Sequence, residues 1–139
     1  MARIAEIMTR SIATVQRDET LQAAAKRMEE MDVGALPVLD GKAIAGMVTD
    51  RDITVRGVAT GMIPQESLVA DVMTEEVRFC RADDTVEQVM AEMGDLQVRR
   101  LPVLDANNEI VGIVALADIA TRQSAHTDET LREISTPGR

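Results

Sequence analysis

The most informative shortage in this chain is that of aromatic side chains, because its 139 residues include one Phe, no Trp and no Tyr. Proteins that bind single-stranded nucleic acids stack bases on aromatic side chains, so this inventory excludes such a platform. The core must consist of aliphatic side chains and of the nine methionines, which fill irregular gaps. A net charge of −9 also opposes non-specific binding to nucleic acid and to anionic membranes. We therefore expect neither as a partner.

Cysteine and long apolar runs are equally scarce. Because Cys80 is the only cysteine, the chain has no internal disulfide and no thiolate metal cluster, which fits a reducing cytoplasm. Residues 2–6 lack the apolar core of a signal peptide, and the apolar runs are too short to span a membrane. The lone His126 has no second ligand nearby in the sequence. We expect a cytoplasmic protein with no metal site.

What the chain does contain is an internal repeat of 65 positions, in which Thr20 matches Thr85 and Pro37 matches Pro102. Beyond Asp105 the offset grows to 66, because the second copy has one more residue in a turn, and a structural repeat tolerates such a change. A unit of this length is long for a solenoid repeat and short for an independent domain. We therefore expect two halves that fold against each other, with a ligand in the groove between them.

Apolar periodicity predicts the order strand, helix, strand, strand, helix in each half. For the first half, the predicted segments are strand 12–15, helix 20–31, strand 36–39, strand 43–48 and a helix from Thr49 that fades near 57–61. For the second half, they are strand 77–80, helix 86–96, strand 101–104, strand 110–114 and helix 116–123. We place repeat 1 at residues 1–62, repeat 2 at 63–124 and a polar C-terminal tail at 125–139.

The most informative local segment is 46–52, with the sequence Gly-Met-Val-Thr-Asp-Arg-Asp. Thr49 followed three positions later by Asp52 is typical of a helix capping box, and capping alone can explain the pair. The same geometry also suits a ligand, because free amides and a hydroxyl at a helix start favour phosphate, and a carboxylate binds a ribose diol. In the second copy Asp118 persists but Ala115 replaces the hydroxyl, which favours a role beyond capping. Both interpretations stay open on this segment.

Taken in order, the doubled Thr-Leu or Thr-Val helix, the Leu-Pro-Val-Leu-Asp strand and the Gly-x-h-x-Thr-x-x-Asp segment resemble a pair of cystathionine-beta-synthase (CBS) domains, the Bateman module. The likeness covers residues 4–123. It implies an α+β fold of two β-α-β-β-α repeats, related by pseudo-twofold symmetry and packed through short sheets. It further implies a regulatory protein that binds adenosine nucleotides, needs no cofactor and forms a homodimer.

The resemblance also assigns candidate binding residues by their place in the family's motifs. Asp52 matches the acid that binds ribose, and Thr49 matches the hydroxyl beside it. Arg100 matches an arginine that binds phosphates in the related gamma subunit of AMP-activated protein kinase, and Arg99 replaces a histidine of that protein. Asp118 marks a weaker second site. The positions that line the base or lie near the ligand are Thr9, Ala13, Val33, Gly34, Ala35 and Met47.

These assignments predict a sensor that binds AMP, ADP or ATP in the cleft between the repeats and transmits its occupancy to an effector protein that the sequence does not identify. Two alternatives remain. In the first, the chain is a ligand-independent dimerisation module in which Thr49 and Asp52 only cap a helix; in the second, it senses another adenosyl ligand such as S-adenosylmethionine or NAD. We do not expect an enzyme, because the sequence offers no nucleophile–base pair, no paired carboxylates and no metal cluster.

Overall fold

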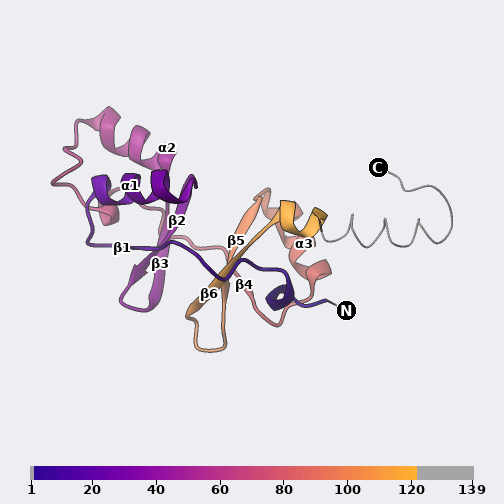
Figure 1. The fold of residues 1–139 in the computed structure, drawn as a ribbon. Coiled ribbons are helices and arrows are strands. Elements are labelled where there is room, and N and C mark those ends of the chain that lie inside the picture. The colour runs from indigo at the N-terminus through magenta and orange to yellow at the C-terminus, as the bar shows by residue number, and fades with distance from the viewer. Residues whose placement is uncertain (1, 122–139) are drawn as a thin grey trace. The chain divides into compact units, whose positions relative to one another are not determined.

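The structure is a computed structural model that describes residues 2–121 (Figure 1). These residues form two compact units, which are described separately below. Unit 1 comprises residues 2–10, 79–106 and 111–121. Unit 2 comprises residues 11–78 and 107–110. Each unit is built around one three-stranded sheet.

Unit 2 contains the strands and helices of the first repeat in the predicted order. They are β1 (Val15–Gln16), α1 (Leu21–Met31), β2 (Ala35–Asp40), β3 (Ala43–Thr49) and α2 (Asp50–Asp52). The short α2 continues as a π-helical turn, η2 (Ile53–Gly57), and a 3-10 turn, η3 (Val58–Thr60). Gly61 ends this run of helix with φ +87°, in the left-handed region that glycine adopts without strain.

The sequence of α1 explains its bounds and its orientation. The Thr20 hydroxyl caps the helix by accepting a hydrogen bond from the Ala23 amide at 3.1 Å, and Asp32, at φ 54°, ends it. Leu21 and Ala24 recur at helical spacing and are completely buried, as the predicted apolar stripe requires. This stripe turns α1 towards the core of unit 2, where the helix also contacts η2.

The sheet of unit 2 has the strand order β1-β2-β3. β1 runs parallel to β2 with Val15 opposite Val38, and β2 runs antiparallel to β3 with Ala35 opposite Thr49. A bulge between Val38 and Leu39 shifts the register of that pair. The pairing of Ala35 with Thr49 brings the start of β2 next to the end of β3, where most of the candidate binding residues of the first repeat lie.

Unit 1 repeats this plan with residues of the second copy. Its strands are β4 (Cys80–Arg81), β5 (Arg100–Leu104) and β6 (Ile110–Ala115), in the order β4-β5-β6, and its long helix is α3 (Val86–Leu96). Thr85 caps α3 as Thr20 caps α1, by accepting from the Gln88 amide at 3.2 Å. Residues 116–121 are helical, and the predicted continuation to residue 123 lies outside the described residues.

Each unit also contains a segment that lies, in the sequence, just before the first strand of the other unit. Residues 2–10 precede the first strand of the first repeat but belong to unit 1, and residues 68–74 precede the first strand of the second repeat but belong to unit 2. Thr74 exchanges two backbone hydrogen bonds of 2.9 Å with Met47 in unit 2, and Thr9 does the same with Ile113 in unit 1, at 2.8 and 2.9 Å. The compact units therefore divide the chain differently from the predicted repeats 1–62 and 63–124, which stay a prediction about sequence equivalence. The predicted tail at 125–139 lies outside the described residues.

Each unit has its own aliphatic core, as the lack of aromatic residues requires. The buried core of unit 2 consists of Val15, Leu21, Ala24, Met28, Leu36, Val38, Val48, Ile53, Val69, Val72 and Met73. The buried core of unit 1 consists of Ile4, Met8, Cys80, Val86, Val89, Met93, Leu101, Val103, Val114 and Ile119. Ile4 and Val69 are fully buried although they belong to residues 2–10 and 68–74, the two segments that precede the strands of the other unit in the sequence. These exchanged segments are therefore integral parts of the cores.

Two predicted strand boundaries were wrong. The first strand was predicted at 12–15 but is Val15–Gln16, and the strand predicted at 77–80 is Cys80–Arg81. In the first case the reason is visible, because the Thr14 carbonyl accepts a hydrogen bond from the Arg27 side chain at 2.9 Å and not from a neighbouring strand. In the second, the register with β5 begins at Cys80, opposite Val103, and pairs no residue before it.

Candidate functional site

The candidate site of unit 2 centres on the capping box at the end of β3. The Thr49 hydroxyl accepts a hydrogen bond from the Asp52 amide at 3.0 Å, and Asp52 Oδ2 accepts one from the Thr49 amide at 3.0 Å. Both halves of the predicted box are therefore formed. The geometry fixes the Asp52 carboxylate against the end of β3, with its side chain 16% exposed.

The amides of the first helical turn are all occupied, which corrects the expectation of free amides for a phosphate. The Asp50 amide donates to the Gly34 carbonyl at 2.9 Å, the Arg51 amide donates to Asp50 Oδ1 at 2.8 Å, and the Asp52 amide donates to Thr49. The sequence argument missed that Asp50 supplies an acceptor of its own. This helix start therefore offers an anion none of these three donors.

The groups that remain for a ligand are side-chain groups. The Thr49 hydroxyl can still donate its proton, because it acts only as an acceptor in the capping box. Among residues 2–121, Asp52 Oδ1 has only the Arg56 Nε as a charged neighbour, at 3.9 Å, which is too long for a hydrogen bond. A carboxylate oxygen with open lone pairs beside a hydroxyl suits the two donors of a vicinal diol.

The residues predicted to line the base, Thr9 apart, lie in the same unit as this capping box. Gly34 contacts Asp50 so closely that a Cβ on Gly34 would lie 3.1 Å from Asp50 Oδ2. Ala13 and Val33 are partly buried and pack against the core of unit 2. The structure therefore places Gly34 directly at the helix start and puts the other predicted wall residues of the first repeat, which are Ala13, Val33, Ala35 and Met47, in the same unit as Thr49 and Asp52.

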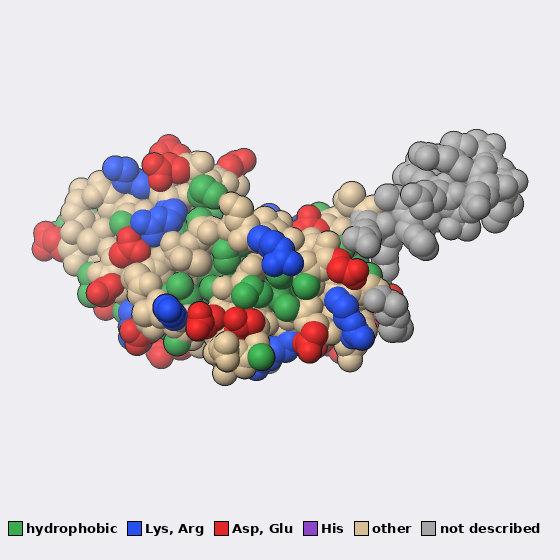
Figure 2. All heavy atoms as spheres, turned by 60° about the horizontal axis from the view of Figure 1, so that its bottom comes forward, with side chains coloured by type: hydrophobic (Ala, Val, Ile, Leu, Met, Phe, Trp, Pro, Cys, Tyr) green, Lys and Arg blue, Asp and Glu red, His purple; other side chains and the backbone are tan. Residues whose placement is uncertain are grey.

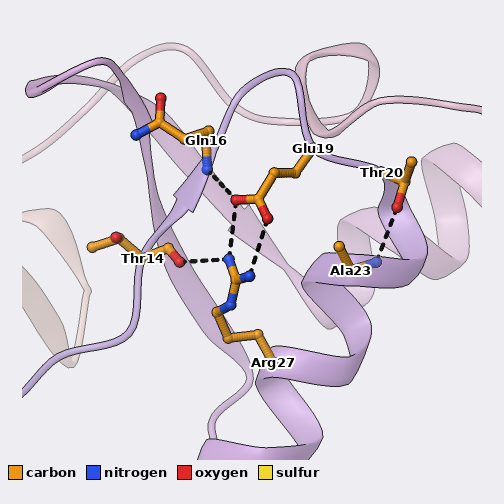
Figure 3. Close-up of polar contacts among 6 residues, drawn as sticks. All are labelled: Thr14, Gln16, Glu19, Thr20, Ala23 and Arg27. Atoms are coloured by element: carbon orange, nitrogen blue, oxygen red, sulfur yellow. Dashed lines mark hydrogen bonds and ion pairs between the residues drawn. The ribbon is translucent and has the colours of Figure 1, made fainter.

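An arginine–glutamate cluster holds the segment that follows Ala13 (Figure 3). Arg27 on α1 binds Glu19 through two parallel hydrogen bonds of 3.0 Å and donates a third, of 2.9 Å, to the Thr14 carbonyl. Glu19 also accepts from the Gln16 amide at 2.8 Å. Hydrogen bonding to Arg27 lowers the pKa of Glu19 below its ordinary value and raises the pKa of Arg27. We call these residues the Arg27 cluster.

The remaining candidate residues belong to unit 1. The Leu116 amide donates to the Arg99 carbonyl at 2.7 Å, and Asp118 Oδ2 accepts from the Ala115 amide at 3.2 Å. These contacts place Arg99 beside the helix start that carries Asp118, and the neighbouring Arg100 is exposed at the start of β5. Whether Arg99 and Arg100 bind the same ligand as Asp52 stays a prediction.

Thr9 and Thr74 lie in different units from those that the sequence suggested. Thr9, predicted to lie near the ligand of the first repeat, pairs with Ile113 in unit 1. Its counterpart Thr74 pairs with Met47, two residues before Thr49, and sequence reasoning did not select it. The signal was available, because residues 6–9 and 71–74 have similar sequences and both end in Met-Thr. The role predicted for Thr9 stays a prediction.

The described residues were predicted to hold neither a catalytic nucleophile nor a metal, and this prediction depends on their cysteine and their potential metal ligands. Burial and two nearby carboxylates raise the pKa of the Cys80 thiol to about 12, which leaves it protonated and unreactive. Residues 2–121 contain no group of three potential ligands placed to hold a metal ion. Within the same range, no helix has the length and apolar character needed to cross a membrane.

Comparison with known families explains why the geometry occurs twice. The model of the CBS domain matches residues 4–57 and residues 69–125. The chain belongs to the CBS domain family. Among its relatives, the CBS domain-containing protein YhcV of Bacillus subtilis is 40% identical over 126 residues, which cover 91% of this chain and 89% of YhcV. Hypoxic response protein 1 of Mycobacterium tuberculosis is 36% identical over 127 residues, or 91% of this chain and 88% of that protein.

Solved structures of CBS-pair proteins share the fold. The crystal structure of Hypoxic Response Protein I with two coordinated zinc ions matches with a TM-score of 0.78 and 36% identity, covering 86% of this chain and 98% of that one. CBSX2 in complex with AMP matches with a TM-score of 0.77 over 91% of this chain and 99% of that chain, but at 21% identity, so this likeness shows the fold alone. The predicted α+β fold of a CBS pair is thus confirmed.

Proposed function

We propose that this CBS pair is a regulatory module that binds an adenosine nucleotide, AMP, ADP or ATP, with Asp52 as the acceptor for the ribose. The observation that carries the proposal is that the two oxygens of the Asp52 carboxylate have different environments. Oδ2 is held by the Thr49 amide, whereas Oδ1 has no hydrogen bond within residues 2–121. An acid oriented by one oxygen and open at the other is preorganised to accept from the ribose hydroxyls.

The class of ligand is supported by the family. A CBS-pair protein of the same fold, CBSX2, has been solved in complex with AMP. The Thr49 hydroxyl lies beside Asp52 and can donate to a group attached to the 5′ end of the ribose. Because the amides of the helix start are occupied, the charge of the phosphates requires cations elsewhere, and Arg99 and Arg100 are our candidates for that role.

Such a module regulates by differential binding and does not need to catalyse a reaction. A ligand that binds one arrangement of the two repeats more tightly shifts the population towards it, and an effector protein senses the shift. We further propose that the chain works in the cytoplasm as a homodimer. Light scattering at micromolar concentration tests the dimer, and a monomer would contradict it.

The experiment that tests the ribose site is calorimetry with AMP, ADP and ATP on the wild type and on Asp52→Asn. The Asn oxygen can still accept from the Thr49 amide, but its amide group replaces the open acceptor with a donor. We expect affinity to fall at least about tenfold, as for a site that loses a hydrogen bond to a charged acceptor. Asp118→Asn, the equivalent change at the predicted weaker second site, should leave the affinity of the first site unchanged. Undiminished binding to Asp52→Asn would remove the proposed site.

One observation favours a ligand-independent interaction module instead, because several large apolar side chains of unit 2 are exposed. They are Met31, Val55, Val58 and Ile63, with exposed fractions between 45% and 57%. Figure 2 shows hydrophobic side chains that reach the surface among acidic and basic ones. In this case Asp52→Ala lowers the melting temperature, while no nucleotide raises that of the wild type.

A third candidate is a sensor of another adenosyl ligand, such as S-adenosylmethionine or NAD. The occupied amides favour this candidate, because a ligand that has no phosphate at this helix start does not need them as hydrogen-bond donors. A thermal-shift panel of adenosine, AMP, ADP, ATP, S-adenosylmethionine, NAD and the matching guanosine compounds separates the candidates. The ligand that produces the largest shift at equal concentration identifies the class.

A further inference from the structure

The Arg27 cluster is more elaborate than its turn requires. In both repeats an acid accepts the backbone amide three residues before it: Glu19 accepts from Gln16 at 2.8 Å, and Asp84 accepts from Arg81 at 2.9 Å. The acid therefore suffices to hold the turn. The position that matches Arg27 in the second repeat is Glu92, so the arginine is present only in the first.

Arg27 adds a link that fixes the backbone at Thr14 to helix α1. Its guanidinium joins α1 to the Thr14 carbonyl, while Glu19 holds the plane of the guanidinium with two parallel bonds (Figure 3). A guanidinium held in this way loses little further freedom when it binds a third acceptor. The carbonyl that it holds belongs to the residue directly after Ala13, the predicted wall for the base.

We propose that Arg27 is a positioning residue that fixes the Ala13–Thr14 backbone against the base of the adenosyl ligand and so sets the selectivity for the base. This inference rests on the proposed function. Arg27 itself does not touch the ligand. The cluster occurs in the repeat that carries both Thr49 and Asp52, and it is missing from the repeat in which Ala115 replaces the hydroxyl.

The test measures two ratios of dissociation constants by calorimetry. Inosine against adenosine reports discrimination of the base, and 2′-deoxyadenosine against adenosine reports recognition of the diol. We expect Arg27→Met to reduce the base ratio about fivefold, an ordinary effect of losing one positioning contact, and to leave the diol ratio unchanged. Asp52→Asn should do the reverse. A structural role alone would weaken all three ligands equally and leave both ratios as they were.

Lys26→Met is the matched control, because Lys26 is the exposed neighbour of Arg27 on α1 and its replacement removes the same charge. It should change neither ratio. Should Arg27→Met not fold, Arg27→Lys keeps the charge but not the pair of parallel bonds, and it should still reduce the base ratio.

The outcomes separate this inference from the function on which it rests. If Asp52→Asn changes the diol ratio while neither Arg27 variant changes the base ratio, the positioning role is wrong and the ribose site stands. If the wild type binds no adenosyl compound, or if Asp52→Asn leaves the diol ratio unchanged, the proposed function fails and this inference fails with it.

Discussion

The two repeats form the same backbone contacts from different side chains. The Asp50 amide donates to the Gly34 carbonyl at 2.9 Å, and at the equivalent place the Leu116 amide donates to the Arg99 carbonyl at 2.7 Å. Each bond joins the start of the middle strand to the start of the following helix. Neither bond uses a side chain, so the residue types at these positions can differ between the repeats. The first repeat has Asp50 and Gly34, and the second has Leu116 and Arg99 at the equivalent positions.

The residues kept in both copies are those that the backbone needs. Thr20 and Thr85 each cap a helix, and Gly46 and Gly112 each allow another segment to approach the edge strand. Among the residues of the proposed site, the acid is kept, as Asp52 and Asp118, whereas the hydroxyl of Thr49 is replaced by Ala115. The comparison teaches that both repeats keep the scaffold and the acid, whereas the first repeat alone adds the capping hydroxyl of Thr49.

The largest expected effect tests the shared scaffold at its closest contact. A Cβ on Gly46 would lie 2.5 Å from the Thr74 carbonyl oxygen, which is backbone and cannot rotate away. We expect Gly46→Ala to lower the free energy of unfolding by about 3 kcal/mol, at the upper end of ordinary overpacking. Urea denaturation followed by circular dichroism measures it.

The same substitution in the second repeat and at an open helix position gives the controls. Gly112→Ala would meet Met8 Sδ at 2.7 Å and the Thr9 carbonyl at 2.8 Å, so we expect a loss of similar size. On α3, a Cβ added to Gly94 would meet no atom within 4 Å, and Gly94→Ala should stabilise the protein by up to about 1 kcal/mol. Equal effects at the three glycines would contradict the role of the exchanged segments.

A smaller effect is expected when the hydroxyl is removed from position 49 and, in a second variant, added at the equivalent position 115. Thr49→Ala removes the acceptor for the Asp52 amide and should lower the free energy of unfolding by about 1 kcal/mol. Ala115→Thr places a hydroxyl where Asp118 already accepts the amide of residue 115, and it should stabilise by somewhat less than about 1 kcal/mol. Thermal denaturation of both variants tests this pair, and shifts of the same sign would show that the two helix starts are not equivalent.

The next effect concerns the Arg27 cluster and depends on pH. Because Arg27 lowers the pKa of Glu19 in the folded protein, the ion pair stabilises the fold above the unfolded pKa of about 4.5. This contribution is lost as the pH falls through the lower, folded pKa. Both side chains are about one third exposed, so Glu19→Gln should cost less than about 1 kcal/mol at pH 7.

The measurement is the difference in unfolding free energy between the wild type and Glu19→Gln, taken from pH 7 down to pH 3.5. The difference should shrink as the pH falls below about 4.5 and be smallest at the acidic end. Lys26→Met, which removes a charge that takes no part in the Arg27 cluster, should give a difference that is flat over the same range. A difference that grows at low pH would contradict the assigned direction.

Much of the fold could be predicted because its signals are local. Helix caps at Thr20 and Thr85, apolar stripes and turn residues each fall within a few positions of the element that they determine. The start of the first strand could not be predicted, because it depends on Arg27 binding the Thr14 carbonyl across 13 positions. The exchange of residues 2–10 and 68–74 between the units has the same origin, since its pairings are long-range.

The candidate site divides in the same way. The capping box of Thr49 and Asp52 was predicted from spacing alone, and the structure forms it. The occupation of the Arg51 amide by Asp50 was not predicted, because it depends on one side-chain rotamer. Spacing therefore identifies the residues of a helix start, but which donors stay open is decided by the conformations of their neighbours.

The smallest expected effect lies at Cys80, which matches Val15 of the first repeat. Each residue pairs with a valine of the neighbouring strand, Val103 or Val38, and each is almost completely buried. Because the first repeat holds a valine in the same pairing, the second sheet should accommodate the extra methyl group, and Cys80→Val should change the free energy of unfolding by less than about 1 kcal/mol, below the usual cost of overpacking a core. Urea denaturation of the variant tests this equivalence.

Labelling of the wild-type thiol provides an independent measurement at the same position. With a pKa of about 12, the buried thiol is almost wholly protonated at pH 8, so iodoacetamide should react with it only when unit 1 opens. The labelling rate should therefore rise with urea in parallel with unfolding. Fast labelling of the native protein would show that β4 opens independently of the rest of unit 1, and the close match between the two sheets would then apply to their average structure but not to their local stability.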